Sequence, residues 1–102
     1  MCHALQLEVV DNVATVVVDV AKDTHLTVQT PGATVAIAAV EAIAFGHKIA
    51  LQPIKTGEIV TKYGRPIGRA TRDIARGGYV GVNNIEGMRG RGDIVTAQGG
   101  AQ

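Results

Sequence analysis

One glycine spacing, written three times, constrains the fold of this chain more than any other feature of its sequence. The pattern Ile-x-x-Gly-x-x-Ile/Val begins at Ile43, at Ile54 and at Ile74. Each copy joins an apolar anchor to a tight turn closed by glycine, and then to an apolar residue that opens the next strand. The repeat therefore predicts short strands separated by tight turns.

Other segments carry the same signature of strands between turns. Apolar alternation or β-branched runs predict strands over residues 5–9, 13–20, 25–28, 47–51, 59–62, 67–71 and 79–82. Residues 34–42 also favour a strand, although their alanines permit a helix, and Gly64-Arg65-Pro66 predicts a tight turn. No segment shows a convincing amphipathic helix, so we expect an all-β sandwich, barrel or clip.

Composition limits the size of the core and the kinds of partner. A chain of 102 residues with no Trp, one Phe and two Tyr is expected to fold as one domain around a modest core of Val, Ile, Leu and Ala. The net charge of +1 argues against a nucleic-acid or membrane-surface partner. Cys2 has no second cysteine to pair with, and neither a basic leader nor a long apolar run is present. These features predict a cytoplasmic protein.

His47 is the first candidate for chemistry. It directly follows the turn glycine Gly46 and precedes an apolar strand, which places it at a sheet rim, where functional sites collect. An imidazole at such a position serves as a metal ligand or as a proton-transfer group. The alternative is a rim histidine that hydrogen-bonds a neighbouring backbone carbonyl, and the residue alone does not decide between them.

Basic and phenolic side chains form a second candidate group. Ammonium, guanidinium and phenol groups together suit a small polyhydroxylated carboxylate. The alternative is an ordinary solvated sheet face with one tyrosine filling a gap. The residues of this group are Lys48, Lys62, Tyr63, Arg65 and Arg69.

The rest of the sequence contains no motif that identifies a metal site, a nucleotide site or a catalytic nucleophile. Zinc patterns, phosphate loops, dinucleotide fingerprints and nucleophile elbows are absent from the sequence. Residues 88–93 read Met-Arg-Gly-Arg-Gly-Asp, in which Arg-Gly-Asp is best explained by chance and two arginines are too few for RNA binding. Four aspartates lie at turns and are expected to cap backbone amides rather than to catalyse: Asp11, Asp19, Asp23 and Asp73.

Three motifs follow one another in an order that resembles a known family. They are Gly46-His47-Lys48-x-Ala50-Leu51, Lys62-Tyr63-Gly64-x-x-Ile67-Gly68-x-Ala70, and Asp73-Ile74-x-x-Gly77. This order resembles the SAF-type small subunit of the altronate/galactarate dehydratase family, which includes sulfolactate sulfo-lyase small subunits. The resemblance covers roughly residues 5–93. It implies an all-β SAF-type β-clip of short strands joined by glycine turns over residues 1–86, followed by a flexible glycine-rich tail or linker over 87–102.

The resemblance also implies a function. Members of the family remove water from a sugar acid by β-elimination. This chain is then the small subunit of such a hydro-lyase, acting on a sugar acid or similar hydroxy-carboxylate, inactive alone and completing the active site of a large catalytic subunit. The implied cofactor is iron(II) or magnesium, held mainly by that large subunit, with His47 as catalytic residue and candidate metal ligand. The implied substrate-binding residues are Lys48, Lys62, Tyr63, Arg89 and Arg91.

One departure from the family pattern bears on activity. Relatives often carry a His-x-His-x-His-Asn-like run at the last strand, where this chain has Tyr79, Gly81 and Asn83 in the histidine positions and keeps Asn84. The departure implies a lost function or a different substrate. A non-catalytic SAF-like binding or assembly module is therefore the alternative to a lyase subunit. We expect a large partner subunit in the first case, and a homo-oligomer when the chain is alone.

Overall fold

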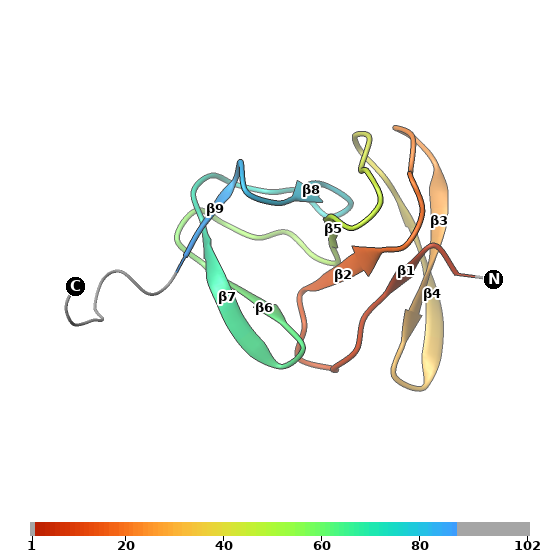
Figure 1. Cartoon of the computed structure of the whole chain (residues 1–102), viewed down its shortest axis with the longest axis horizontal. Helices are drawn as coiled ribbons and strands as arrows, with labels where there is room; N and C mark the ends of the chain where they lie inside the picture. The colour runs from red at the N-terminus through yellow and green to blue at the C-terminus, as the bar shows by residue number, and fades with distance from the viewer. Residues whose placement is uncertain (1, 88–102) are drawn as a thin grey trace.

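The computed structural model describes residues 2–87, which form strands and turns and contain no helix (Figure 1). The all-β, SAF-type prediction is confirmed, and strand rather than helix forms in the ambiguous alanine-rich segment. No helix in this part of the chain could cross a membrane. The strands are β1 (Ala4–Leu5), β2 (Val13–Val16), β3 (His25–Thr30), β4 (Ala33–Ala38), β5 (Lys48–Ala50), β6 (Ile59–Lys62), β7 (Arg65–Ala70), β8 (Tyr79–Val80) and β9 (Ile85–Glu86).

The strands form two sheets. The larger has the order β4-β3-β1-β2-β5-β8, and the smaller has the order β6-β7-β9. Neighbouring strands are antiparallel except for β1 and β3, which run parallel. Figure 1 shows the β6–β7 hairpin of the small sheet beside β2 and β5 of the large one. Strand β5 therefore lies where the two sheets meet.

Each copy of the glycine repeat folds into the same structural unit, which we call a corner. Its glycine has a positive φ of 90° at Gly46, 87° at Gly57 and 86° at Gly77. The next residue closes the turn by donating its N–H to the carbonyl three residues earlier, at 3.1, 2.9 and 2.9 Å respectively. Positive φ at the third residue of a type II turn favours glycine, because a Cβ there is strained. The predicted turns are confirmed.

A further corner lies between Val20 and Leu26 and has no glycine. Asp23 takes the glycine position with φ 70°, and the N–H of Thr24 closes the turn onto the Ala21 carbonyl at 3.2 Å. Aspartate tolerates this left-handed conformation better than most residues. A search for glycine spacing therefore misses this corner.

The corners associate in pairs through their apolar anchors. Val20 exchanges two backbone hydrogen bonds with Ile43, both of 2.8 Å. Ile54 and Ile74 do the same, at 2.8 and 2.7 Å. Each anchor pair is buried, so each pair joins two distant turns inside an apolar cluster.

Two apolar clusters replace the single core expected from composition. Strand alternation explains the division, because successive residues of β2 and β5 point to opposite faces. The first cluster contains Ala4, Ala14, Val16, Val20, Leu26, Val28, Ile37, Ala39, Ile43 and Ile49. The second lies between the sheets and contains Val13, Ala50, Ile54, Val60, Ala70, Ile74 and Val80.

Two local predictions are wrong. The strand predicted over 5–9 ends at Leu5, and Leu7 and Val9 are 53% and 76% exposed, because the chain turns away from the sheet after β1. The hairpin turn lies at Tyr63 and Gly64, with φ of 57° and 73°, so Arg65 already belongs to β7. Two successive positive φ values form the type I′ hairpin turn whose twist matches its strands.

The expectation that turn aspartates cap backbone amides is confirmed at three positions. Asp11 accepts N–H groups from three residues, Asp19 accepts that of Phe45 at 2.8 Å, and Asp73 accepts that of Thr56 at 2.9 Å. The hydrogen bonds from Thr56 hold the pKa of Asp73 below its ordinary value. These carboxylates therefore stabilise turns.

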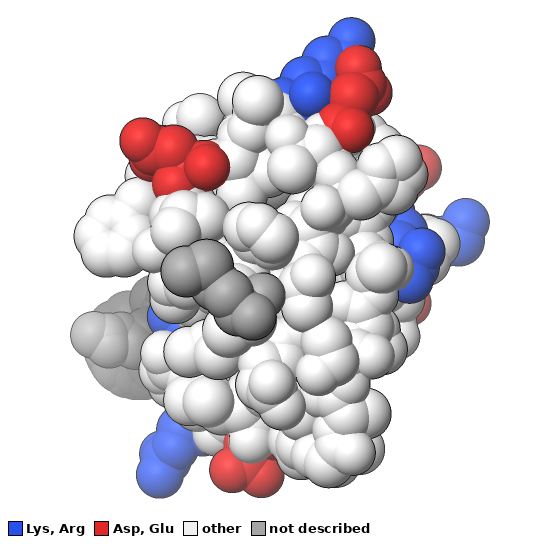
Figure 2. Space-filling model, turned by 90° about the vertical axis from the view of Figure 1, so that its right-hand side faces the viewer, with Lys and Arg blue, Asp and Glu red and all other residues white. Residues whose placement is uncertain are grey.

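Strand β4 forms the outer edge of the large sheet. Its residues carry no charge and no proline, and all but Ile37 are exposed. The side of the molecule that includes β3 and β4 shows charged side chains mainly at its margins (Figure 2). Charges, prolines and bulges are the usual means of blocking strand pairing at an edge, and β4 has none of them.

Two corner glycines give a matched test of the corner geometry. An added Cβ would meet open space at Gly57 but would overlap the Ala38 carbonyl at Gly77. We expect Gly57→Ala to cost about 1–2 kcal/mol of unfolding free energy from positive φ alone. Gly77→Ala is expected to cost at least about 1 kcal/mol more, because backbone must move. Urea denaturation of both variants measures the difference, and equal losses would contradict the close approach at Gly77.

Candidate functional site

An open pocket of about 580 Å³ is lined by residues 19–20 after β2, by residues 41–47 before β5, and by residues of β8 and the turn after it. The pocket brings His47 together with Tyr79 and Asn83, which are far from it in the sequence. Tyr79 and Asn83 occupy two of the positions where relatives often carry histidines. Its lining residues are Asp19, Val20, Glu41, Ala42, Ile43, Ala44, His47, Tyr79 and Asn83.

His47 is oriented by its own corner. Its Nδ1 lies 3.3 Å from the Ala44 carbonyl oxygen, which is the hydrogen bond that the alternative interpretation expected. A carbonyl can only accept, so in the neutral ring Nδ1 carries the proton and Nε2 keeps its lone pair. The same contact therefore leaves His47 with one nitrogen able to accept a proton or bind a metal.

Tyr79 packs beside His47, with ring centroids 5.3 Å apart and a tilt of 42°. Its backbone is held from two sides, because its N–H donates to Glu41 at 3.0 Å and its carbonyl accepts from the buried Asn84 at 2.7 Å. Its hydroxyl occupies the space that a Cβ at Gly81 would need. Tyr79 and Gly81, which occupy two of the histidine positions of the family pattern, therefore form one packing unit.

The charged groups of the pocket are acidic. One oxygen of Asp19 and one of Glu41 accept backbone N–H groups, and neither carboxylate forms an ion pair within residues 2–87. No lysine or arginine is among the lining residues. Carboxylate, amide, phenol and imidazole groups suit the hydroxyl groups of a ligand or a cation better than an anion.

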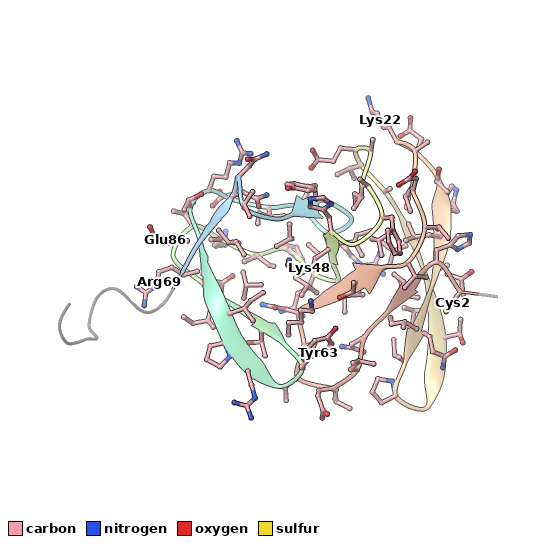
Figure 3. All side chains as sticks on the ribbon, viewed as in Figure 1. Cys2, Lys22, Lys48, Tyr63, Arg69 and Glu86 are labelled. Atoms are coloured by element: carbon pink, nitrogen blue, oxygen red, sulfur yellow. The ribbon has the colours of Figure 1, made fainter. Side chains whose placement is uncertain are left out.

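Lys48, Lys62 and Tyr63 form a separate basic cluster: Lys48 lies on the other face of β5, and Lys62 and Tyr63 lie at the end of β6 and in the turn that follows. Lys48 pairs across the sheet with Thr15 and Val80, and Val80 belongs to the cluster between the sheets. Partial burial lowers the pKa of Lys48, and the nearby positive charge of Lys62 lowers it further. The Nζ of Lys62 lies 4.7 Å from the centroid of the Tyr63 ring. Figure 3 shows Tyr63 at the tip of the β6–β7 hairpin.

The other basic candidates are placed differently. Arg65 is exposed beside the hairpin turn, and Arg69 lies on β7 opposite Ile59 and Glu86. Arg89 and Arg91 lie outside the described residues, as does most of the segment predicted as a tail.

A resident metal ion would need several donor side chains close together. Among residues 2–87, no group of three or more histidine, cysteine, aspartate or glutamate side chains could hold a metal ion. His47 offers one imidazole nitrogen, and the pocket carboxylates are each tied to a backbone N–H. The described residues alone therefore do not fit a resident metal site.

Comparison with known proteins places this architecture in a family. Residues 2–88 match the family described as the SAF domain of altronate/galactarate dehydratase. Altronate dehydratase from Escherichia coli (strain K12) is 39% identical over 80 residues, which cover 78% of this chain and 15% of that protein.

Two sulfo-lyase subunits are also similar. The alpha subunit of (2R)-sulfolactate sulfo-lyase from Chromohalobacter salexigens is 39% identical over 49 residues, or 48% of this chain and 52% of that subunit. The alpha subunit from Paracoccus pantotrophus is 40% identical over 47 residues, or 46% of this chain and 70% of that subunit. The aligned part of this chain thus spans a small fraction of the dehydratase and about half of the first sulfo-lyase subunit.

The proximity of the two lysines predicts a coupled titration. We expect Lys62→Met to raise the pKa of Lys48, because one positive charge is removed, while burial still holds it below its ordinary 10.5. An NMR pH titration of the Lys48 side chain measures this shift. Lys22→Met is the control, since Lys22 is exposed and is not a cause of the Lys48 shift. Equal pKa values in all three proteins would contradict the proximity.

The packing of Tyr79 over Gly81 predicts a local displacement. Gly81→Ala should push the Tyr79 ring away from His47, at little cost in melting temperature, because the obstructing atom is the end of a side chain. NMR contacts between the two rings report the change. Gly87→Ala is the control, since an added Cβ there meets nothing within 4 Å. Unchanged ring contacts in the Gly81 variant would show that the hydroxyl does not lie over Gly81.

Proposed function

Because this chain belongs to the altronate/galactarate dehydratase SAF-domain family, we propose that it is the small subunit of a hydro-lyase. The substrate class is a sugar acid or a similar hydroxy-carboxylate, from which water is lost by β-elimination. Relatives of this chain are named altronate dehydratase or alpha subunit of a sulfo-lyase, and the subunit names support a role beside a second chain. The chain alone is expected to be inactive.

The observation that carries the proposal is the pocket that joins His47 to Tyr79 and Asn83. Dehydration moves one proton off the carbon next to the carboxylate and delivers one to the departing hydroxyl. His47 accepts or donates such a proton through Nε2, because Nδ1 is engaged by the Ala44 carbonyl. The Tyr79 phenol and the Asn83 amide hydrogen-bond hydroxyl groups of the substrate.

A divalent metal belongs to the proposal only through the partner. Iron(II) or magnesium would stabilise the negative charge that develops on the substrate. Since the described residues of this chain gather no donor set of their own, we assign the metal mainly to the large subunit. The role of this chain is then to cover the site and to supply His47.

Assembly is tested first. The chain is co-expressed with the enzyme-like chain encoded beside its gene, and the product is analysed by native mass spectrometry. A stable mixed complex that carries a divalent metal is expected, followed by dehydration activity in a screen of sugar acids. A monomer or homo-oligomer without metal would support the alternative, a non-catalytic SAF-like binding or assembly module.

The role of His47 is tested in the assembled enzyme. We expect His47→Ala to lower kcat by about 10²–10⁴-fold, the usual contribution of a proton-transfer group, with the circular dichroism spectrum unchanged. His25→Ala is the matched control, because His25 is exposed on β3 and does not line the pocket. An unchanged kcat in the His47 variant would exclude His47 as the proton-transfer group.

A further inference from the structure

The positive charge of Lys62 in the small sheet acts on the partly buried Lys48 of the large sheet. Lys48 on β5 and Lys62 on β6 are both partly buried, and neither forms an ion pair within residues 2–87. Two ammonium groups repel each other, and partial burial strengthens the repulsion because less water screens it. A negatively charged group bound near both lysines would offset this repulsion.

A strained turn holds Lys62 in this position. Tyr63 has a φ of 57°, a left-handed conformation that is strained for a residue other than glycine. Asp11, only 5% exposed, accepts the N–H groups of Glu8 at 3.1 Å, Tyr63 at 3.0 Å and Gly64 at 2.8 Å. This buried carboxylate therefore fixes the turn directly after Lys62.

Asn12 holds the strand on the other side of Lys62. Its side chain donates to the Ile59 carbonyl at 2.9 Å and accepts the Thr61 N–H at 2.8 Å. Both ends of the lysine-bearing segment are thus bound by side chains of one loop. The loop before β2 therefore fixes the β6–β7 hairpin, and with it the backbone on both sides of Lys62.

A buried hydroxyl without a hydrogen-bond partner in residues 2–87 lies on the strand next to Lys48. Thr15 is directly opposite Lys48 on β2, so the two side chains share a face of the sheet. The Thr15 hydroxyl is buried and has no hydrogen-bond partner among the described residues. Buried polar groups without a partner are rare and often mark the place of a missing ligand or water. An anion there would balance both lysines and accept from the hydroxyl.

We propose that Lys48, Lys62 and Thr15 form a binding site for a carboxylate group, and that Asp11 is the positioning residue that sets its geometry. The site lies on the face of β5 opposite the His47 pocket. The carboxylate comes either from a small hydroxy acid or from a side chain of a partner protein. Only the first source connects the site to the proposed function.

Binding is measured on the full chain by NMR titration with tartrate at constant ionic strength. We expect saturable shifts at Lys48, Lys62 and Thr15, and no such shifts with threitol, which keeps the hydroxyls but has no carboxylate. Lys48→Met and Lys62→Met should each weaken the Kd at least ten-fold. Arg65→Met removes a charge from the same hairpin and should change the Kd less than two-fold, because Arg65 is exposed beyond the turn.

Thr15→Val separates a functional hydroxyl from a structural one. Since the hydroxyl has no partner in the free chain, the variant should have an equal or higher melting temperature, yet weaker tartrate binding. A lower melting temperature with unchanged binding would remove Thr15 from the site.

Asp11 is tested in a background that relieves the strained turn. Tyr63→Gly removes the strain, so we expect Asp11→Ala in this background to remain folded, which circular dichroism checks. The double variant should bind tartrate at least ten-fold more weakly than Tyr63→Gly alone. Equal binding would show that Asp11 acts on stability only.

The two carboxylate sources give different results. If tartrate shifts no residue of the free chain, the site survives only when Lys48→Met disrupts the complex with the large subunit while Arg65→Met does not. If neither result appears, the site does not exist. None of these measurements depends on enzyme activity. The carboxylate site can therefore be confirmed or excluded even if the chain is not a lyase subunit.

Discussion

The exchange of backbone hydrogen bonds between paired corners is the interaction on which the rest of this structure depends. Three of the strands in residues 2–87 have only two residues, below the usual strand length, and so contribute few hydrogen bonds to their sheets. The Val20–Ile43 and Ile54–Ile74 pairs bring turns that are distant in sequence into contact, and each pair is sealed in an apolar cluster. The pocket inherits its geometry from this arrangement, because His47 directly follows one corner and Tyr79 closely follows another.

Because side chains alternate along β5, they separate two groups of candidate functional residues. Ile49 pairs with Tyr79, whereas Lys48 pairs with Val80, so the aromatic pocket and Lys48 lie on opposite faces of one short strand. The candidate residues expected to form one substrate site thus form an acidic, hydroxyl-compatible pocket and a separate basic cluster. A single small molecule contacting this chain meets one of these environments, and a partner chain would supply what each lacks.

The local features of the fold were predictable from the sequence, and the contacts between distant residues were not. Glycine spacing predicts the corners at Gly46, Gly57 and Gly77, because positive φ favours glycine, but Asp23 adopts the same conformation and escapes the pattern. The position of His47 at a rim follows from Gly46. The role of Asp11 depends on amides 52 and 53 residues away, which no periodicity reveals. Alternation also failed after Leu5, since it does not show where a chain leaves its sheet.

The open edge of β4 bears on the behaviour of the chain in concentrated solution. The outer side of this neutral, six-residue strand presents amide and carbonyl groups to any other extended segment. Edges of this kind nucleate intermolecular β-structure, and long-range association then competes with folding during synthesis. A single lysine introduced at an outward-facing position such as Ala36 would act as a gatekeeper, slowing aggregation without entering either apolar cluster.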